Sequence, residues 1–416
     1  MTEAMGPLLI TGCGTLGDHL PLVALARGLR ERGMRAVLAF NPAMIALARD
    51  AGLEARAHGD AYGEDAARAA AATYDHWQRP FAQAPTDPEL APVIADDARA
   101  LAGVLRESGA VALLAPAQDP SGRMAAELAG VPWLGAVLMA AQLCTDDDAP
   151  RDAPSRAVDA RTARVFDHAR RSLGLPALGT DDVLAHLVAP QAMLAVSPAF
   201  HRPDPVRFPG IEATGPWLAP PPGAGSWRPP PALSAFMRRD PAPLVLTFSS
   251  LPLASPAAVL ERYARAARRA GRSLLVVAGW AGFEPGMLAG AGDDSVMVEP
   301  FAPHDWLFER AGAVITHGGM GTLTRALRAG RPVLVEPYGN DQIFNALRVV
   351  QLGVGAAVHP HRATAEGCAR VLTERVLRPE CTAAAKAMAA AMREEDGVAR
   401  ATEWLSRRVS TCSAGG

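Results

Sequence analysis

A short apolar strand, a glycine-rich turn and a helix follow one another around His317, and this succession constrains the fold more than any other segment. The strand is predicted over Ala313–Thr316, the turn reads H-G-G-M-G, and the helix is expected to run from Thr322 to about Gly330. The first N–H groups of a helix and its positive dipole end favour an anion, and glycines let the backbone approach a ligand closely. The segment therefore predicts an α/β domain with a phosphate-binding turn at a strand end.

Polar side chains around this turn extend the predicted site beyond a phosphate. His317 and Thr322 add side-chain donors, and Asp341-Gln342 follows a second strand at the start of the next helix. An acceptor and an amide placed there suit sugar hydroxyls, so the segment suggests a nucleotide-sugar site. In the simpler interpretation the glycines form only a tight connection, Asp341 caps a helix and Asn345 is structural.

Strand and helix patterns alternate along both halves of the chain, which indicates parallel sheets covered on both faces. In the N-terminal half the first helix is expected over Leu20–Arg32, and strands are predicted over Pro7–Gly12, Arg35–Phe40, Leu53–Ala57, Val111–Ala115, Trp133–Val137 and Met193–Val196, the last strand of this half. In the C-terminal half, strands are predicted over Leu244–Phe248, Ser273–Ala278, Val296–Val298, Ala313–Thr316 and Pro332–Glu336. The expected fold class is α/β, with two Rossmann-like doubly wound parallel-sheet domains.

The length of 416 residues favours two domains, and a proline-rich stretch lies between the two alternating series. Proline at this density favours an extended, semi-rigid chain. We expect an N-terminal domain over residues 1–215, a linker over 216–240 and a C-terminal domain over 241–395. The last segment, 396–416, contains a helix that is expected to return to the N-terminal domain.

Charge, cysteine use and hydropathy exclude several classes of protein. The 41 basic and 43 acidic residues nearly balance, which disfavours nucleic acid as a partner. No metal site is expected, because the spacing of the five cysteines does not suit a metal: Cys13, Cys144, Cys368, Cys381 and Cys412. No apolar run reaches the length of a membrane span and no signal sequence is evident, so a cytoplasmic location is expected.

A second glycine-rich turn follows the first strand of the chain. Residues 12–17 read G-C-G-T-L-G, which is the spacing of a dinucleotide-binding fingerprint. That fingerprint also requires an acidic residue at the end of the second strand, but this strand ends in Ala39-Phe40-Asn41. The alternative, in which glycines such as Gly17 clear space for a substrate, is therefore favoured over NAD.

Asp18 follows this turn at the corner between strand and helix, and it is the candidate general base. In the simpler interpretation it is only the N-cap of the helix. His19 is a second candidate for the base, and Asp119 is a candidate to support it. His76, Trp77 and Phe81 lie in an irregular segment and are candidates to line an acceptor pocket.

Together these motifs resemble the inverting nucleotide-sugar glycosyltransferases that include sterol, macrolide and glycopeptide-antibiotic enzymes. The second-half signature is present as P-H-D-W-L-F at 303–308, H-G-G-M-G-T at 317–322 and D-Q at 341–342. The first-half signature is present at 14–21. The resemblance is specific over about residues 296–355 and moderate over 8–33. It implies the GT-B fold, with acceptor and donor domains facing across a cleft.

The resemblance also implies a role for individual residues. His317, Gly319 and Thr322, with Met320 and Gly321 of the same turn, would hold the diphosphate together with Ser250. Phe301 would stack on the base and the backbone of His304 would meet its edge, while Asp341 and Gln342 would bind donor-sugar hydroxyls. Asp18 matches the position of the catalytic base.

Three positions depart from the family pattern. Arg325 stands where plant members carry a ribose-binding glutamate, which bears on the choice between uridine and thymidine donors. Ser249 replaces a usual glycine in the first phosphate turn. Met320 replaces the tryptophan of plant members, as in the bacterial branch.

The expected function is inverting transfer of a sugar from a UDP- or dTDP-sugar to a hydroxyl of a small lipophilic natural product. The nucleotide sugar is a co-substrate, and neither a cofactor nor a metal is expected. The expected oligomeric state is a monomer or homodimer. Two alternatives remain open: a catalytically silent sugar-nucleotide-binding partner of another transferase, and a sugar-nucleotide epimerase of the same fold.

Overall fold

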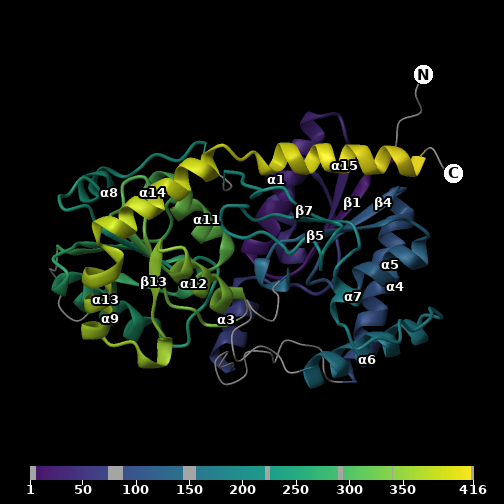
Figure 1. Cartoon of the computed structure of the whole chain (residues 1–416), viewed down its shortest axis with the longest axis horizontal. Coiled ribbons are helices and arrows are strands. Elements are labelled where there is room, and N and C mark those ends of the chain that lie inside the picture. Colours follow the sequence, from purple (N-terminus) through teal and green to yellow (C-terminus); the bar gives the residue numbers. More distant parts are fainter. Residues whose placement is uncertain are drawn as a thin grey trace. The chain divides into compact units, whose positions relative to one another are not determined.

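The computed structural model describes residues 6–73, 88–143, 156–220, 225–288, 294–339 and 341–413 (Figure 1). These residues form two units, each with its own parallel sheet. Unit 1 contains residues 6–63, 88–143, 156–220 and 396–413, and unit 2 contains 64–73, 225–288, 294–339 and 341–395. His76, Trp77 and Phe81 lie outside the described residues, so their role in acceptor binding stays a prediction.

The strands described in unit 1 form one parallel sheet in the order β3-β2-β1-β4-β5-β6-β7. They are β1 (Leu8–Gly12), β2 (Ala36–Phe40), β3 (Glu54–Ala57), β4 (Ala112–Pro116), β5 (Trp133–Val137), β6 (Ala192–Leu194) and β7 (Ile211–Ala213). Because both sheet faces are covered, β1 and β2 are buried along their whole length and read as apolar runs. The prediction that Met193–Val196 is the last strand of this half is wrong, because β7 adds to the edge of β6. Strand β7 has three residues, and none of them is fully buried, so its sequence gives no apolar run.

Helices cover the sheet of unit 1. They are α1 (Leu16–Glu31), α2 (Ile45–Asp50), α4 (Leu90–Ser108), α5 (Gly122–Ala129), α6 (Arg156–Ser172), α7 (Leu184–Leu187) and α15 (Gly397–Ser413), with short 3₁₀ turns at η1 (Pro42–Met44) and η2 (Ala140–Leu143). Figure 1 shows the C-terminal helix α15 running beside α1. The two helices approach so closely that a Cβ on Gly28 would lie 2.3 Å from a methyl of Val398.

The strands described in unit 2 form a second parallel sheet in the order β10-β9-β8-β11-β12-β13. They are β8 (Leu244–Thr247), β9 (Leu274–Val277), β10 (Val296–Glu299), β11 (Ala313–Thr316), β12 (Val333–Val335) and β13 (Gly355–Ala357). The edge strand β13 has the sequence G-A-A, which carries no β-branched or aromatic residue and was therefore not predicted. All of β8, β9, β11 and β12 is buried, as their apolar sequences require.

Helices α3 (Glu64–Thr73), α8 (Pro231–Phe236), α9 (Pro256–Arg269), α10 (His304–Phe308), α11 (Met320–Arg328), α12 (Asp341–Gln351), α13 (Ala365–Val371) and α14 (Pro379–Arg393) belong to unit 2. Short turns of other helix types occur at η3 (Gly279–Ala281), η4 (Pro285–Met287), η5 (Pro360–Arg362) and η6 (Leu372–Val376). Helix α8 lies within the stretch expected to be a linker. In the described part of the chain, no helix combines the length and the hydropathy needed to cross a bilayer.

Two predicted helix starts are wrong by two to four residues. Helix α1 begins at Leu16 rather than Leu20, and α11 begins at Met320 rather than Thr322. In each case glycines lie inside or next to the first turn, and their low helix propensity moved the predicted start along the chain.

Candidate active site

In each sheet the strand order reverses at one point, and the loops that flank this point carry the candidate site residues. In unit 1 the chain leaves β1 for β2 on one side and returns to β4 on the other. In unit 2 it leaves β8 for β9 and returns to β11 in the same way. Because ligands of open α/β sheets bind outside the carboxyl ends of the strands at such a reversal, the loops after β1, β4, β8 and β11 are the expected binding loops.

Asp18 lies in the first turn of α1, directly after β1, and both of its carboxylate oxygens are held. The backbone N–H of Thr15 donates to Oδ2 at 2.8 Å, and the Thr15 hydroxyl donates to the same oxygen at 3.3 Å. The side-chain amide of Gln118, in the loop after β4, donates to Oδ1 at 3.2 Å. Thr15, rather than Asp18, is the N-cap residue of α1. Asp18 thus helps to cap the helix through one oxygen, while the residue as a whole stays partly exposed.

The turn before Asp18 requires glycine at position 14. Gly14 has φ +92°, in the left-handed region, and a Cβ there would lie 2.4 Å from Asp18 Oδ2. The glycine spacing that resembles a dinucleotide fingerprint therefore makes room for a carboxylate. This packing accounts for the motif without a dinucleotide.

Burial raises the pKa of Asp18 from 3.8 to about 6, even though the Thr15 donors act in the opposite direction. A carboxyl with a pKa near 6 is largely ionised at neutral pH and is still a stronger base than an exposed aspartate. Such a pKa suits a group that accepts a proton from a reacting hydroxyl. Asp18 therefore has the properties expected of a general base.

His19, the second candidate for the base, is fully buried against Phe40. Its Nδ1 lies 2.9 Å from the carbonyl oxygen of Thr15, so Nδ1 carries the proton. Burial lowers the pKa of His19, and among the described residues its Nε2 has no hydrogen-bond partner. A fully buried ring has less access to a substrate hydroxyl than the half-buried Asp18, and the geometry favours Asp18.

Asp119 does not contact Asp18 or His19 through any hydrogen bond among the described residues. Its Oδ1 accepts from the backbone and the hydroxyl of Ser121 at 2.9 and 2.7 Å, and its Oδ2 accepts from Thr11 at 2.9 Å. These bonds tie the start of α5 to β1. The neighbour that does contact Asp18, Gln118, was missed because 100 residues separate the two in sequence.

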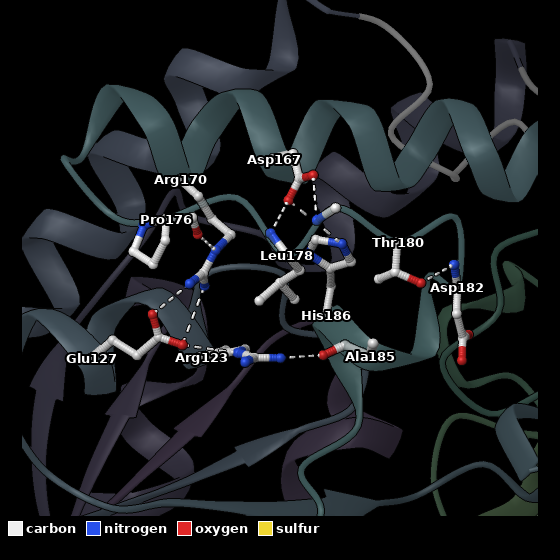
Figure 2. Close-up of polar contacts among 11 residues, drawn as sticks. Arg123, Glu127, Asp167, Arg170, Pro176, Leu178, Thr180, Asp182, Ala185 and His186 are labelled. Carbon is white, nitrogen blue, oxygen red and sulfur yellow. Dashed lines mark hydrogen bonds and ion pairs between the residues drawn. The ribbon is translucent and has the colours of Figure 1, made fainter.

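A buried polar network joins α5 and α6 in the same unit (Figure 2). Arg170, whose side chain is 2 % exposed, donates from two nitrogens to the carboxylate of Glu127 at 3.2 and 2.7 Å. Arg123 donates to the same carboxylate at 2.9 Å and, at its other end, to the carbonyl of Ala185 in α7. The two guanidinium groups hold the pKa of Glu127 below its usual value despite partial burial.

Asp167 fixes the segment between α6 and α7. Its carboxylate accepts from the backbone N–H groups of Leu178 and Gly179 at 2.7 and 3.1 Å. Figure 2 shows His186 of α7 directed toward the same carboxylate, at 4.0 Å. The network positions three helices of unit 1, and no local sequence pattern signalled it because its members are far apart in the chain.

In unit 2, the turn after β8 holds a serine in an unusual backbone conformation. Ser249 has φ +51°, where glycine is normally found. Its carbonyl accepts from the N–H of Trp280 at 2.8 Å, and a Cβ on the neighbouring Gly279 would lie 2.4 Å from that carbonyl oxygen. The turn therefore keeps the geometry of a glycine turn and presents Ser250, which is 9 % exposed, just beyond it.

His317 follows β11 and lies across the second glycine turn. A Cβ on Gly319 would lie 2.4 Å from His317 Nε2, so glycine is required for the ring to occupy this place. The ring edge faces Phe248, with 6.1 Å between centroids. Burial, together with nearby His304, lowers the pKa of His317 to about 3. The imidazole is therefore neutral at pH 7 and interacts with an anion through an N–H rather than through charge.

The first turn of α11 supplies backbone donors beside His317. The N–H of Leu323 bonds to the carbonyl of Gly319 at 3.1 Å, so the helical ladder begins there. The preceding N–H groups, at Met320, Gly321 and Thr322, belong to the turn that has no acceptor within a helix. With the helix dipole, this arrangement suits a phosphate.

Asp341 and Gln342 open α12, as expected, and one residue ties them to the glycine turn. The amide of Asn345 donates to Asp341 Oδ2 at 2.8 Å and to the carbonyl of Gly318 at 2.9 Å. Gln342 accepts from the N–H of Tyr338 through Oε1 at 2.8 Å, which leaves its NH₂ group as the donor. Asn345 is thus the structural link between the two loops of the predicted donor site.

The loop after β10 presents an exposed aromatic ring. Phe301 is 48 % exposed, whereas the ring of His304 stacks on Phe308 at 4.7 Å. Burial and the charge of Arg325 lower the pKa of His304 to about 4. Arg325 forms an ion pair with Asp305 at 2.6 Å, so this departure from the family pattern makes a contact within the P-H-D-W-L-F motif.

Among the described residues, no group of three or more His, Cys, Asp or Glu side chains is arranged to hold a metal ion.

Comparison with solved structures identifies the fold. The glycotransferase of kitacinnamycin matches with a TM-score of 0.72, covering 97 % of this chain and 99 % of that one at 21 % identity. Two doubly wound parallel-sheet units of this kind define the GT-B fold.

Comparison of sequences identifies the family. Residues 288–402 match the model of the erythromycin biosynthesis protein CIII-like C-terminal domain. The dTDP-epi-vancosaminyltransferase of Amycolatopsis orientalis is 30 % identical over 91 % of each chain. The O-mycaminosyltylonolide 6-deoxyallosyltransferase of Streptomyces fradiae is 33 % identical over 58 % of this chain, which spans 56 % of that protein's length. The chain belongs to the macrolide and glycopeptide-antibiotic glycosyltransferase family, as the motifs predicted.

Proposed function

We propose that this protein transfers a sugar from a dTDP- or UDP-sugar to a hydroxyl of a small lipophilic natural product, with inversion at the anomeric carbon. Relatives named O-mycaminosyltylonolide 6-deoxyallosyltransferase and dTDP-epi-vancosaminyltransferase support this substrate class. The observation that carries the proposal is Asp18, a partly exposed residue whose carboxyl has a pKa of about 6, at the strand-order reversal of unit 1.

In the proposed reaction Asp18 removes the proton from the acceptor hydroxyl as that oxygen attacks the anomeric carbon. The Thr15 and Gln118 donors fix the orientation of the carboxylate, so that little reorganisation is needed. The bond from the anomeric carbon to the donor phosphate breaks, and the nucleoside diphosphate leaves. General-base assistance of this kind is worth about 10²- to 10⁴-fold in rate.

Unit 2 would stabilise the charge that develops on the leaving diphosphate. The donors are the first N–H groups of α11, the neutral His317 ring, and the hydroxyls of Thr322 and Ser250. Such donors are fixed before the reaction and therefore contribute without reorganisation, at about 2.7–4 kcal/mol for one lost donor in comparable sites. In this proposal these groups replace a metal ion, and the nucleotide sugar is a co-substrate.

The donor nucleoside would bind beside the diphosphate. The exposed face of Phe301 suits stacking on a base, and the loop that begins α10 would meet the base edge. Position 325 holds an arginine, which is paired with Asp305, and not a carboxylate that could bind the ribose hydroxyls. This favours a deoxyribose donor such as dTDP-sugar over UDP-sugar.

The test is product formation by the purified protein with a panel of dTDP- and UDP-sugars and macrolide or polyketide aglycones. Mass spectrometry detects the glycoside, and the anomeric coupling constant in its NMR spectrum reports inversion or retention. Asp18→Ala is expected to keep donor affinity and to lose transfer by about 10²- to 10⁴-fold. Asp50→Ala, a change at an exposed carboxylate in the same unit, is the control and should retain full activity. Full activity of Asp18→Ala, or retention of configuration, would overturn the proposal.

A further inference from the structure

A fully buried carboxylate, that of Glu336, lies at the carboxyl end of β12. The segment from β12 to α12, which leads to Asp341 and Gln342, is called the donor loop here. Glu336 is 0 % exposed and bonds to donors from two different elements. Arg262 and Tyr263, adjacent residues of α9, donate to Oε1 and Oε2 respectively, and the hydroxyl of Tyr338 donates to Oε1 at 2.6 Å. Of these three hydrogen-bond donors, only Tyr338 belongs to the donor loop.

Burying this charged network costs free energy, and its hydrogen bonds fix the positions of its members. A buried ion pair usually adds little net stability, because the charges lose their hydration. Hydrogen bonds to both oxygens of a buried carboxylate, however, restrict the groups that make them to one arrangement. Both oxygens of Glu336 are occupied, and its backbone N–H donates to Thr316 of β11 at 2.9 Å. The network thus joins α9, β11, β12 and the following segment.

Tyr338 connects this network to the residues expected to bind the donor sugar. Its backbone N–H donates to Gln342 Oε1 at 2.8 Å, which leaves the NH₂ group of Gln342 to act as a donor. Its ring packs edge-on against Phe248, with 5.7 Å between centroids, and Phe248 in turn faces His317. A single residue therefore contacts the Glu336 carboxylate through its hydroxyl and Gln342 through its backbone N–H.

We propose that Tyr338, anchored by Glu336, is a positioning residue that sets the orientation of Gln342 and so determines affinity for the sugar half of the donor. This inference rests on the proposed function. The diphosphate donors, in contrast, are carried by the turns after β8 and β11, which do not depend on the hydroxyl of Tyr338. Loss of that hydroxyl should therefore weaken binding of the nucleotide sugar but not of the nucleoside diphosphate.

The chain offers a matched control for this test. Tyr263→Phe and Tyr338→Phe each remove one hydroxyl bonded to Glu336, but only Tyr338 lies on the donor loop. Both variants are expected to lose similar thermal stability. Dissociation constants for dTDP and for the dTDP-sugar that the wild-type protein binds most tightly are measured by calorimetry with the full chain.

For Tyr338→Phe the dissociation constant of the sugar donor is expected to rise about tenfold, since misplacement of a binding group by about 1 Å can cost up to 10²-fold. Its dissociation constant for dTDP should stay within twofold of the wild-type value. For Tyr263→Phe both constants should be unchanged. Glu336→Gln, which weakens the anchor itself, should reproduce the split of Tyr338→Phe.

Other results overturn the inference in recognisable ways. If both tyrosine variants weaken the sugar donor equally, the network acts through general stability and not through position. If Tyr338→Phe weakens dTDP and dTDP-sugar equally, or weakens neither, Gln342 is not set by Tyr338. If the wild-type protein binds dTDP but no nucleotide sugar, the proposed function fails instead.

Discussion

Replacement of Asp18 by asparagine tests whether the carboxyl is as strongly affected by burial as the structure implies. The pKa of Asp18 rises from 3.8 to about 6 because burial disfavours its ionised form. Below pH 3.8 the carboxyl is protonated whether the chain is folded or unfolded, so it costs nothing. As the pH rises from 3.8 to about 6, the unfolded chain ionises this carboxyl while burial keeps it protonated in the folded protein, and stability is lost.

The size of this loss follows from the two pKa values. Each pKa unit corresponds to about 1.36 kcal/mol, so the ionised carboxyl destabilises the fold by about 3 kcal/mol at pH 8. Asparagine has the same shape, carries no charge and still accepts from the Thr15 N–H. Gln118 can turn its amide so that the oxygen accepts from the new NH₂ group. Asp18→Asn is therefore expected to stabilise unit 1 by about 2–3 kcal/mol at pH 8 and by about 1 kcal/mol at pH 4.5.

Urea unfolding at pH 4.5, 6 and 8, followed by far-ultraviolet circular dichroism, measures the difference directly. Wild-type protein should lose stability relative to Asp18→Asn between pH 4 and 7, while an Asp50→Asn control at an exposed position shows no such trend. In the wild type, transfer activity should rise with pH through about 6 and then level off. A stability difference that does not vary with pH, or a wild-type protein that is the more stable at pH 8, would refute the reasoning.

Three further substitutions test the loops and the polar network. Ser249→Gly should stabilise unit 2 by about 1 kcal/mol, because φ +51° is strained for serine and relaxed for glycine; a loss of stability in urea unfolding would contradict this. Gly279→Ala should destabilise it by more than 2 kcal/mol, since the new Cβ would meet the Ser249 carbonyl at 2.4 Å, and an unchanged denaturation midpoint would count against that contact. Arg170→Met should cost about 2–4 kcal/mol by leaving Glu127 with only Arg123, and the same change in a Glu127→Gln background should cost clearly less if the two side chains are coupled.

Most of the fold could be predicted, because the sequence pattern of each strand or helix lies within that element. The strands β5 and β11 have the predicted bounds, since each is a continuous apolar run. Predictions failed where the local signal is weak. Strands β7 and β13 are three residues each, and glycines next to α1 and α11 concealed where those helices begin.

The predicted site shows the same division. Asp18 and His317 could be singled out as candidates because each follows a strand end in a turn with glycines at positions where a Cβ would collide. Asp341 could be singled out because it opens the helix after the next strand. Hydrogen-bond partners that are distant in sequence were not predicted. Gln118 lies 100 residues from Asp18, and Arg262 lies 74 residues from Glu336.

The sequence by itself determined the alternation of strands and helices, the two glycine turns and the family, because these depend on residues close together in the chain. Only the tertiary structure decided which distant side chains surround each candidate group. It placed Gln118 on the carboxylate of Asp18, Arg325 on Asp305, and Tyr338 between Glu336 and Gln342. The physical reason is that hydrogen bonding and desolvation depend on distance in space, which the order of residues along the chain does not fix.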